Sequence, residues 1–247
     1  MNNEVHNNCL NIGLVAHSYE GASLCFKTMC IIGESIMGGH MHPNIVMSST
    51  PMGLSMNGWQ KDNYDEIGTY LLNGIHQVDS AGAKFFICPD NTAHIVLEKI
   101  IEQSPLPGLH IADVVCKEII KNDWKKIGIL GTKWTMNGTV YKNRFEDNNL
   151  IKFLPEPLTQ ERIDIAIFNN LCKGDFSRSV VKIFREAIQE LKYMGAECVI
   201  LGCTEILLII NDDNSSLPVL DSTRLLGKYA VEISINNRIP TRGWIKI

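Results

Sequence analysis

Two stretches of this chain read alike and decide its fold. Residues Ala81–Asp90 read AGAKFFICPD, and residues Met194–Cys203 read MGAECVILGC. Each stretch places Gly-Ala at a helix exit, then a short apolar run, then a small or turn residue, then one reactive side chain. A short apolar run bounded by turn signals is typical of a buried strand. The two stretches lie 113 positions apart and therefore indicate two similar halves.

Two further pairs of segments support the repeat. Ile12–Val15 resembles Ile127–Leu130 at an offset of 115, and Leu106–His110 resembles Leu217–Asp221 at an offset of 111. Continuous apolar strands that alternate with helices favour a parallel sheet covered on both faces. We therefore expect an α/β protein of two pseudo-symmetric domains, each a mostly parallel sheet flanked by helices, with the active site in the cleft between them.

The same patterns set the expected boundaries. The first domain is expected to comprise residues 1–113 plus 219–247, and the second residues 114–218. Expected strands are Asn11–Ala16, Ile45–Ser49, Phe85–Cys88, Lys126–Leu130, Ile151–Leu154, Cys198–Leu201 and Val219–Asp221. Expected helices are Gly21–Met37, Tyr64–Ala81, Ala93–Ile101, Ile111–Lys121, Gln160–Leu171 and Ser177–Met194.

Composition excludes several classes of protein. With 45% hydrophobic and 20% charged residues, the chain of 247 residues is globular and neither disordered nor collagen-like. A net charge of −4 argues against nucleic acid or an acidic membrane as partner. Residues 1–8 do not resemble a secretory signal, and the apolar run Ile206–Ile210 is far too short to span a membrane. The eight cysteines form no CxxC pair, so we expect reduced thiols in a cytoplasmic protein and no structural zinc.

The repeat makes Asp90 and Cys203 equivalent. Ligands of open parallel sheets bind beyond the carboxyl ends of the strands, where both residues fall. Two facing halves would bring the two side chains to one bound molecule from opposite sides. One group removing a proton and the other delivering one to the opposite face suits stereochemical inversion at carbon.

The residues around these positions resemble the aspartate/glutamate racemase family, which works without pyridoxal phosphate. The resemblance rests on Cys88–His94, which reads CPDNTAH, and on Leu201–Ile206, which reads LGCTEI. It extends from about Asn11 to Leu226 and includes the segments at Val15–Glu20 and Leu109–Asp113. The resemblance implies two α/β domains, a catalytic pair in the cleft, no cofactor and a homodimer.

One departure from the family is at the first catalytic position. Many members have cysteine immediately before Asn-Thr, where this chain has Asp90. Cys88 lies two residues earlier and is the alternative thiol, although its position favours the buried end of a strand. The ordinary pKa values of Asp and Cys, about 3.9 and 8.5, make carboxylate plus thiol the resting pair. The opposite placement of the proton costs about 6 kcal/mol. A helix opening at Thr204 would lower the pKa of Cys203 and reduce that cost.

Other residues are expected to bind substrate or to support the pair. Short polar side chains at strand-to-helix turns can hold a carboxylate together with backbone N–H groups. The expected substrate-binding residues are His17, Asn91, Thr92, Thr132, Arg162 and Thr204. Of these, Arg162 matches a family cation for a distal carboxylate, whereas the loop Ser48–Met56 carries no cation. Glu205 and His94 are expected in supporting roles, and His40-Met41-His42 is not expected to bind a metal.

Three functions remain open from the sequence. The first is a cofactor-independent amino-acid racemase acting on a small carboxylate substrate through Asp90 and Cys203. The second is a single-cysteine relative that decarboxylates or isomerises a small diacid. The third is a binding protein that has kept the cleft and lost turnover.

Overall fold

The computed structural model describes residues 9–247, so the prediction about residues 1–8 lies outside the described residues. The chain divides into two compact units. Unit 1 is Met1–Val114 together with Thr223–Ile247, and unit 2 is Val115–Ser222. The chain leaves unit 1 inside helix α6 (Ile111–Lys121) and returns at the start of helix α11 (Ser222–Asn236).

Each unit contains a four-stranded sheet in which all pairings are parallel. The strands of unit 1 are β1 (Ile12–Ala16), β2 (Ile45–Ser49), β3 (Phe85–Ile87) and β4 (Gly108–Leu109), in the order β2-β1-β3-β4. Those of unit 2 are β5 (Lys126–Leu130), β6 (Ile151–Phe153), β7 (Cys198–Leu201) and β8 (Val219–Asp221), in the order β6-β5-β7-β8. The predicted α/β fold with two similar parallel sheets is confirmed.

The strand registers match as closely as the strand orders. Ile12 of β1 lies opposite Phe85 of β3 in unit 1. Ile127 of β5 lies opposite Cys198 of β7 in unit 2. These pairs are related by the offsets of 115 and 113 that the sequence showed, so the repeat holds residue by residue in the central strands.

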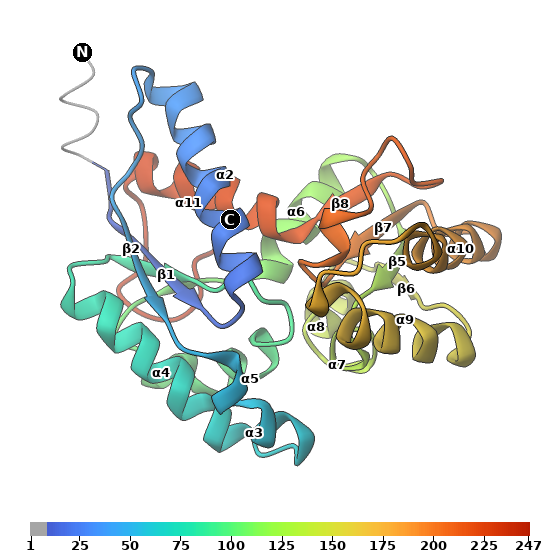
Figure 1. Ribbon diagram of the computed structural model, residues 1–247. Helices are drawn as coiled ribbons and strands as arrows, with labels where there is room; N and C mark the ends of the chain where they lie inside the picture. The colour runs from blue at the N-terminus through green and yellow to red at the C-terminus, as the bar shows by residue number, and fades with distance from the viewer. Residues whose placement is uncertain (1–8) are drawn as a thin grey trace. The chain divides into compact units, whose positions relative to one another are not determined.

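Helices flank both sheets. In unit 1, Figure 1 shows α2 and α11 on one side of the sheet and α4 on the other. The helices of unit 1, besides α6 and α11, are α2 (Tyr19–Met37), α3 (Met56–Gln60), α4 (Tyr64–Ser80) and α5 (His94–Ile100). Those of unit 2 are α7 (Lys133–Asn137), α8 (Lys142–Asp147), α9 (Pro157–Asn169) and α10 (Arg178–Met194). Short 3₁₀ helices lie at η1 (Met52–Leu54), η2 (Ile101–Gln103), η3 (Leu171–Lys173) and η4 (Ile206–Leu208).

The repeated Gly-Ala dipeptides end the helices that precede β3 and β7. Gly82 follows α4 with φ +93°, and Gly195 follows α10 with φ +100°. Residues with a Cβ atom rarely adopt this left-handed conformation, so glycine suits both positions. The start of α4 is also specified locally, because the Asn63 side chain accepts a hydrogen bond from the Glu66 amide at 3.3 Å. Each central strand therefore enters its sheet from a fixed helix end.

Several elements differ from the expectation. Strand β3 ends at Ile87 rather than Cys88, and α9 begins at Pro157, where proline suits the first helical turn. Strand β4 and helices α3, α7, α8 and α11 are not among the elements expected from the sequence. All of these except α11 are too short to show a clear periodicity of hydrophobic residues. In α11, Gly227 weakens the pattern, but a Cβ atom there would lie 3.3 Å from the Cys25 carbonyl oxygen of α2. Tertiary packing overrides propensity at that position.

Gly13 offers a test of how tightly β1 packs on α4. A Cβ atom at Gly13 would lie 2.7 Å from Val78 Cγ2 and 3.1 Å from Ala83 Cβ. Gly13→Ala is therefore expected to lower the free energy of unfolding by about 1–3 kcal/mol, measured by urea denaturation. The matched control is Gly53→Ala, because a Cβ atom there meets nothing within 4 Å. Equal unfolding midpoints for the two variants would contradict this packing.

Candidate active site

The strand order places a reversal point at the centre of each sheet. In unit 1 the chain runs from β1 outward to β2, then returns across β1 to β3 and outward to β4. Ligands of open α/β sheets bind where the strand order reverses, beyond the carboxyl ends of the strands. His17 and Asp90 each lie three residues beyond the paired residues Leu14 and Ile87. They therefore meet at the reversal point of unit 1.

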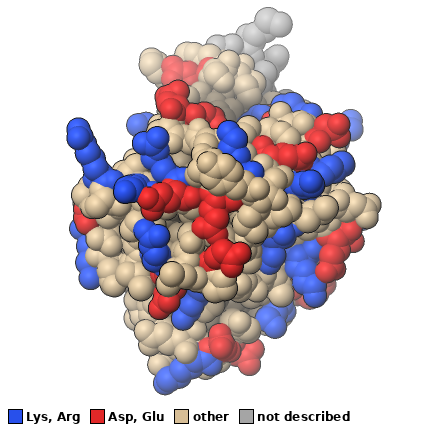
Figure 2. Space-filling model, turned by 90° about the vertical axis from the view of Figure 1, so that its right-hand side faces the viewer, with Lys and Arg blue, Asp and Glu red and all other residues tan. Residues whose placement is uncertain are grey.

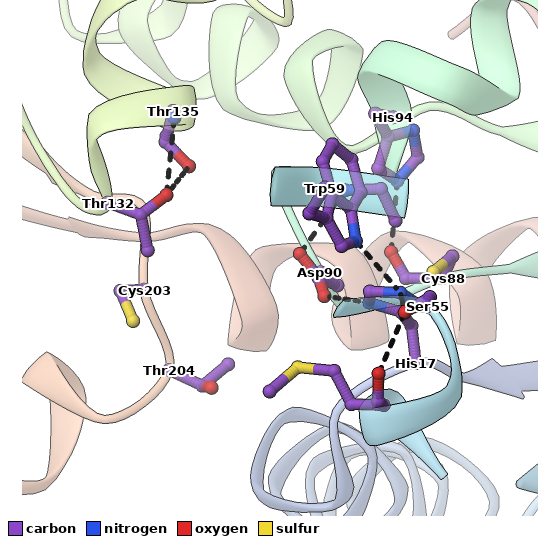
Figure 3. Close-up of polar contacts among 12 residues, drawn as sticks. His17, Ser55, Trp59, Cys88, Asp90, His94, Thr132, Thr135, Cys203 and Thr204 are labelled. Atoms are coloured by element: carbon purple, nitrogen blue, oxygen red, sulfur yellow. Dashed lines mark hydrogen bonds and ion pairs between the residues drawn. The ribbon is translucent and has the colours of Figure 1, made fainter. Parts of the chain in front are cut away.

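Unit 2 repeats this arrangement. Leu130 of β5 pairs with Leu201 of β7, and Thr132 and Cys203 each lie two residues further on. By the repeat, Thr132 corresponds to His17 and Cys203 to Asp90. Figure 3 shows the side chains of the two reversal points.

Asp90 is bound by two groups of its own unit. Its Oδ2 atom lies 2.6 Å from Nδ1 of His17, and its Oδ1 atom accepts a hydrogen bond from the Ala93 amide at 3.3 Å. His17 is 6% exposed and the Asp90 side chain 15% exposed. Asp90 therefore makes the Asx-type bond typical of a residue before a helix and, in addition, a short hydrogen bond with His17 that the sequence patterns do not predict.

The second nitrogen of His17 faces the segment after β2. Ser55 Oγ lies 3.0 Å from His17 Nε2, and the Trp59 indole N–H donates to the same atom at 3.5 Å. The rings of His17 and Trp59 meet edge to face, with centroids 6.0 Å apart. Figure 3 shows the two polar contacts of His17 Nε2 as dashed lines. His17 is thus held from both sides within unit 1.

The hydrogen bonds orient the imidazole ring of His17. The Asp90 carboxylate is an acceptor, so Nδ1 of His17 donates to it. On the other side of the ring, Nε2 faces Ser55 Oγ and the Trp59 indole N–H. The Ser55 hydroxyl donates to the Met52 carbonyl oxygen at 2.9 Å, which holds Ser55 in place beside the ring.

The surroundings keep Asp90 ionised. Burial raises the pKa of the Asp90 carboxyl, but the charge and hydrogen bond of His17 and the amides of Ala93 and Thr92 outweigh burial. The net pKa lies below the ordinary value for aspartate. Asp90 is therefore a carboxylate, ready to accept a proton.

Cys203 has an acidic partner. Its thiol donates to Glu205 Oε2 at 2.8 Å, and the Thr204 hydroxyl donates to the same oxygen at 3.0 Å. The expected helix at Thr204 is absent, because only the 3₁₀ turn η4 follows at Ile206–Leu208. The prediction that a helix dipole would lower the pKa of Cys203 is therefore wrong.

The shift at Cys203 has the opposite sign. Burial, followed by the charge and the side-chain hydrogen bond of Glu205, raises the pKa of the Cys203 thiol well above its ordinary value. Cys203 is therefore a thiol, ready to donate a proton. The environments of Asp90 and Cys203 therefore move their pKa values further apart than those of free aspartate and cysteine side chains.

The remaining expected residues have these positions. Asn91 is buried, and His94 is fully buried and donates from Nε2 to the Cys88 carbonyl oxygen at 2.9 Å. Thr132 caps α7 by accepting from the Thr135 amide at 3.3 Å. Arg162 of α9 is half exposed and pairs with Glu186 of α10 at 3.3 Å. A distal carboxylate of the substrate would have to compete with Glu186 for this cation.

Cys88, the alternative thiol, lies in the core. It has no exposed surface, and burial, followed by the charge of Asp90, raises the pKa of its thiol well above the ordinary value. Ser55 and Trp59, in contrast, are site residues that the sequence patterns do not indicate. They follow β2 at an edge position, and neither periodicity nor the repeat distinguishes them.

The comparisons with known proteins agree with the fold and with the motifs. The sequence profile described as Asp/Glu/Hydantoin racemase matches residues 32–230. The chain belongs to this family. It is 25% identical over 171 residues to the broad specificity amino-acid racemase of Bacillus subtilis (strain 168), covering 68% of this chain and 73% of the relative. It is 26% identical to the glutamate racemase of Aquifex pyrophilus, covering 72% of this chain and 68% of that relative.

Solved structures of the racemase family superpose on the chain. A proposed Asp/Glu racemase from Yersinia pestis is 28% identical, with a TM-score of 0.84, 92% of this chain covered and 99% of the other. An aspartate racemase homologue from Pyrococcus horikoshii OT3 is 25% identical, with a TM-score of 0.77, 91% of this chain covered and 98% of the other. The two-domain α/β racemase fold is therefore established for this chain.

Three further observations concern residues 9–247 only. No helix in this range is long and apolar enough to cross a membrane, and no group of three or more His, Cys, Asp or Glu side chains could hold a metal ion. None of the cysteines in this range forms a disulfide. On the face drawn in Figure 2, basic and acidic side chains are interspersed rather than gathered by sign.

Proposed function

We propose that this protein is a cofactor-independent amino-acid racemase in which Asp90 and Cys203 exchange protons with one substrate α-carbon. The observation that carries the proposal is the equivalence of the two residues beyond β3 and β7, with opposite acid–base states. One position of the repeat holds a base and the other holds an acid. Inversion at carbon needs this combination.

The direction of the proposed proton transfer follows from the resting protonation states of Asp90 and Cys203. The Asp90 carboxylate removes the α-proton from one face of the substrate, and the Cys203 thiol delivers its proton to the opposite face. The product is the other enantiomer, and the enzyme is left with Asp90 protonated and Cys203 as thiolate. Glu205, which accepts the thiol hydrogen bond at rest, lies beside the thiolate and disfavours it. Return of the proton to Cys203 is therefore strongly downhill.

This imbalance does not prevent catalysis in both directions. Two enantiomers have equal free energy in water, so kcat/KM must be the same for both. The unequal resting pair instead gives unequal kcat and KM values for the two enantiomers. An enzyme with two matched thiols would show nearly equal values.

Substrate binding is proposed from the polar groups beside the pair. Asn91 and Thr92 lie beside Asp90, and Thr132 and Thr204 beside Cys203; they can hold the substrate α-carboxylate and stabilise charge that develops as the α-proton leaves. The racemase relatives named above act on amino acids, which supports an amino acid as substrate. Arg162 remains the proposed contact for a side-chain carboxylate. The family resemblance further supports a cytoplasmic homodimer that works without a cofactor.

The proposal is tested by incubating the protein with single enantiomers of aspartate, glutamate and uncharged amino acids, and separating the products on a chiral column. Appearance of the opposite enantiomer is expected for at least one amino acid. Release of carbon dioxide from a diacid, or ligand-dependent thermal stabilisation without any product, would replace the racemase by one of the other two functions.

The pH dependence of kcat/KM should report the His17–Asp90 pair. Because the Asp90 pKa is lowered, the carboxylate stays ionised and kcat/KM should be level down to about pH 5. His17→Leu removes both the charge and the donor, so the buried carboxyl should have a higher pKa. The acid limb is then expected to move up by about one to three pH units. In His17→Asn, which keeps a hydrogen-bond donor, the acid limb of the kcat/KM profile should lie between those of the wild type and His17→Leu.

The control for this series is His76→Asn, because His76 is exposed on α4. It should leave the pH profile unchanged. A wild-type profile that rises only above pH 8 would indicate a thiolate base and would exclude Asp90 as the base of the resting enzyme.

A further inference from the structure

A partly buried polar cluster in unit 1 has no part in the proposed proton transfers. It consists of His94, Glu98, His110 and Trp244. His94 and His110 have no exposed surface, and their ring centroids lie 4.4 Å apart. The Trp244 ring lies 4.6 Å from His110 and 5.8 Å from His94, measured between centroids. Residues of α5, of the turn after β4 and of the C-terminal segment therefore meet in one place.

Glu98 joins the cluster through both carboxylate oxygens. Its Oε2 atom accepts a hydrogen bond from the Trp244 indole N–H at 3.3 Å, and its Oε1 atom lies 3.2 Å from His110 Nε2. The Ala112 amide donates to His110 Nδ1 at 3.1 Å, so a neutral His110 carries its proton on Nε2, facing Glu98. The cluster is thus specified by polar contacts as well as by packing.

The C-terminal segment Gly243–Ile245 is tied to β4. The Gly108 amide donates to the Gly243 carbonyl at 3.0 Å, and the Ile245 amide donates to the Gly108 carbonyl at 2.8 Å. A Cβ atom at Gly108 would lie 2.6 Å from Phe86 Cζ and 2.8 Å from Trp244 Cζ3. Glycine at position 108 therefore allows Trp244 to approach the sheet.

The cluster is connected to Asp90 through His94. His94 Nε2 donates to the carbonyl oxygen of Cys88 at 2.9 Å, as Figure 3 shows. Pro89 follows with a fixed φ angle, and Asp90 comes next. The His94 ring therefore contacts the backbone two residues before Asp90.

We propose that Gly243–Ile245 is a positioning element for Asp90, with Trp244 holding His94 through ring contacts and through Glu98 and His110. The inference rests on the proposed function, because it assigns Trp244 and His94 to the placement of its base. Neither residue is proposed to touch the substrate. A small displacement of a reacting group costs up to about 100-fold in rate, so loss of this support should appear in kcat.

The kinetic test compares four variants of the full chain. Trp244→Phe keeps a ring and removes the N–H donor, and is expected to lower kcat about tenfold with KM changed less than about twofold. His94→Leu should have a larger effect, and His94→Gln, whose amide can still donate to Cys88, should recover part of the loss. Trp124→Phe makes the same chemical change in unit 2, outside the cluster, and should leave kcat unchanged.

A spectroscopic readout separates this inference from the proposed function. The Nδ1 proton of His17, between His17 and Asp90, should give a downfield proton NMR signal. Trp244→Phe and His94→Leu should shift or broaden this signal, whereas Trp124→Phe should not. If the wild-type protein racemises no amino acid, the proposed function fails, but the NMR comparison still tests the positioning of Asp90. Variants that lower only the melting temperature, with kcat and the His17 signal unchanged, would overturn the inference.

Discussion

Cys203→Ser is expected to abolish racemisation while leaving proton exchange on one enantiomer. An alcohol is a far weaker acid than a thiol, so delivery of the proton to the second face should fall by about 10²- to 10⁴-fold. Asp90 is still ionised in this variant and can remove the α-proton and return a solvent proton to the same face. In D2O the substrate of one configuration should lose its α-proton signal without inversion.

The matched control for Cys203→Ser is Cys30→Ser. Cys30 lies partly exposed on α2 of unit 1 and has no role in the proposed reaction. The Cys30→Ser variant should racemise the substrate at the wild-type rate. Full racemase activity in Cys203→Ser would remove Cys203 from the mechanism, and loss of activity in Cys30→Ser would show that the assay reports folding.

Asp90→Asn is expected to be the more damaging change, because it should stop exchange with both enantiomers. The remaining group, Cys203, is a thiol whose pKa is raised by burial and by Glu205, so it cannot act as a base near neutral pH. Racemisation should fall by about 10²- to 10⁴-fold, and α-proton exchange in D2O should fall with it. The asymmetry between the two variants follows from the opposite shifts of the two pKa values.

Two further variants make the Asp90 result decisive. Asp147→Asn, at an exposed position of α8, should behave as wild type. Cys88→Ser should keep racemase activity, because the Cys88 thiol lies in the core with a raised pKa. Activity that survives Asp90→Asn and disappears in Cys88→Ser would make Cys88 the working group and Asp90 a helix-capping residue.

The fold was predictable because three levels of sequence information agree. The apolar strands, the Gly-Ala helix ends and the constant offset all indicate two parallel sheets, and the registers of β1 with β3 and of β5 with β7 repeat that offset. The short elements were not predictable. Strand β4 is two residues long, and Gly108 is chosen by its approach to Phe86 and Trp244, which are distant in sequence.

The candidate site was predictable in its positions but not in its electrostatics. The repeat and the motifs point to Asp90 and Cys203. The position of His17 beside Asp90 follows from the pairing of Leu14 with Ile87, which the sequence alone does not reveal. The signs of the pKa shifts depend on which partner each group has in three dimensions. His17 lowers the pKa of Asp90, and Glu205 raises that of Cys203.

The central claim is that two different groups handle the proton on the two faces of one α-carbon. The most direct test follows a single enantiomer in D2O with wild-type protein, measuring α-deuterium separately in product and in recovered substrate at low conversion. With Asp90 removing the proton and Cys203 delivering a solvent-derived one, the product should be deuterated while the recovered substrate stays protiated. Equal early deuteration of both enantiomers, or a product that keeps the original proton, would contradict the two-group account.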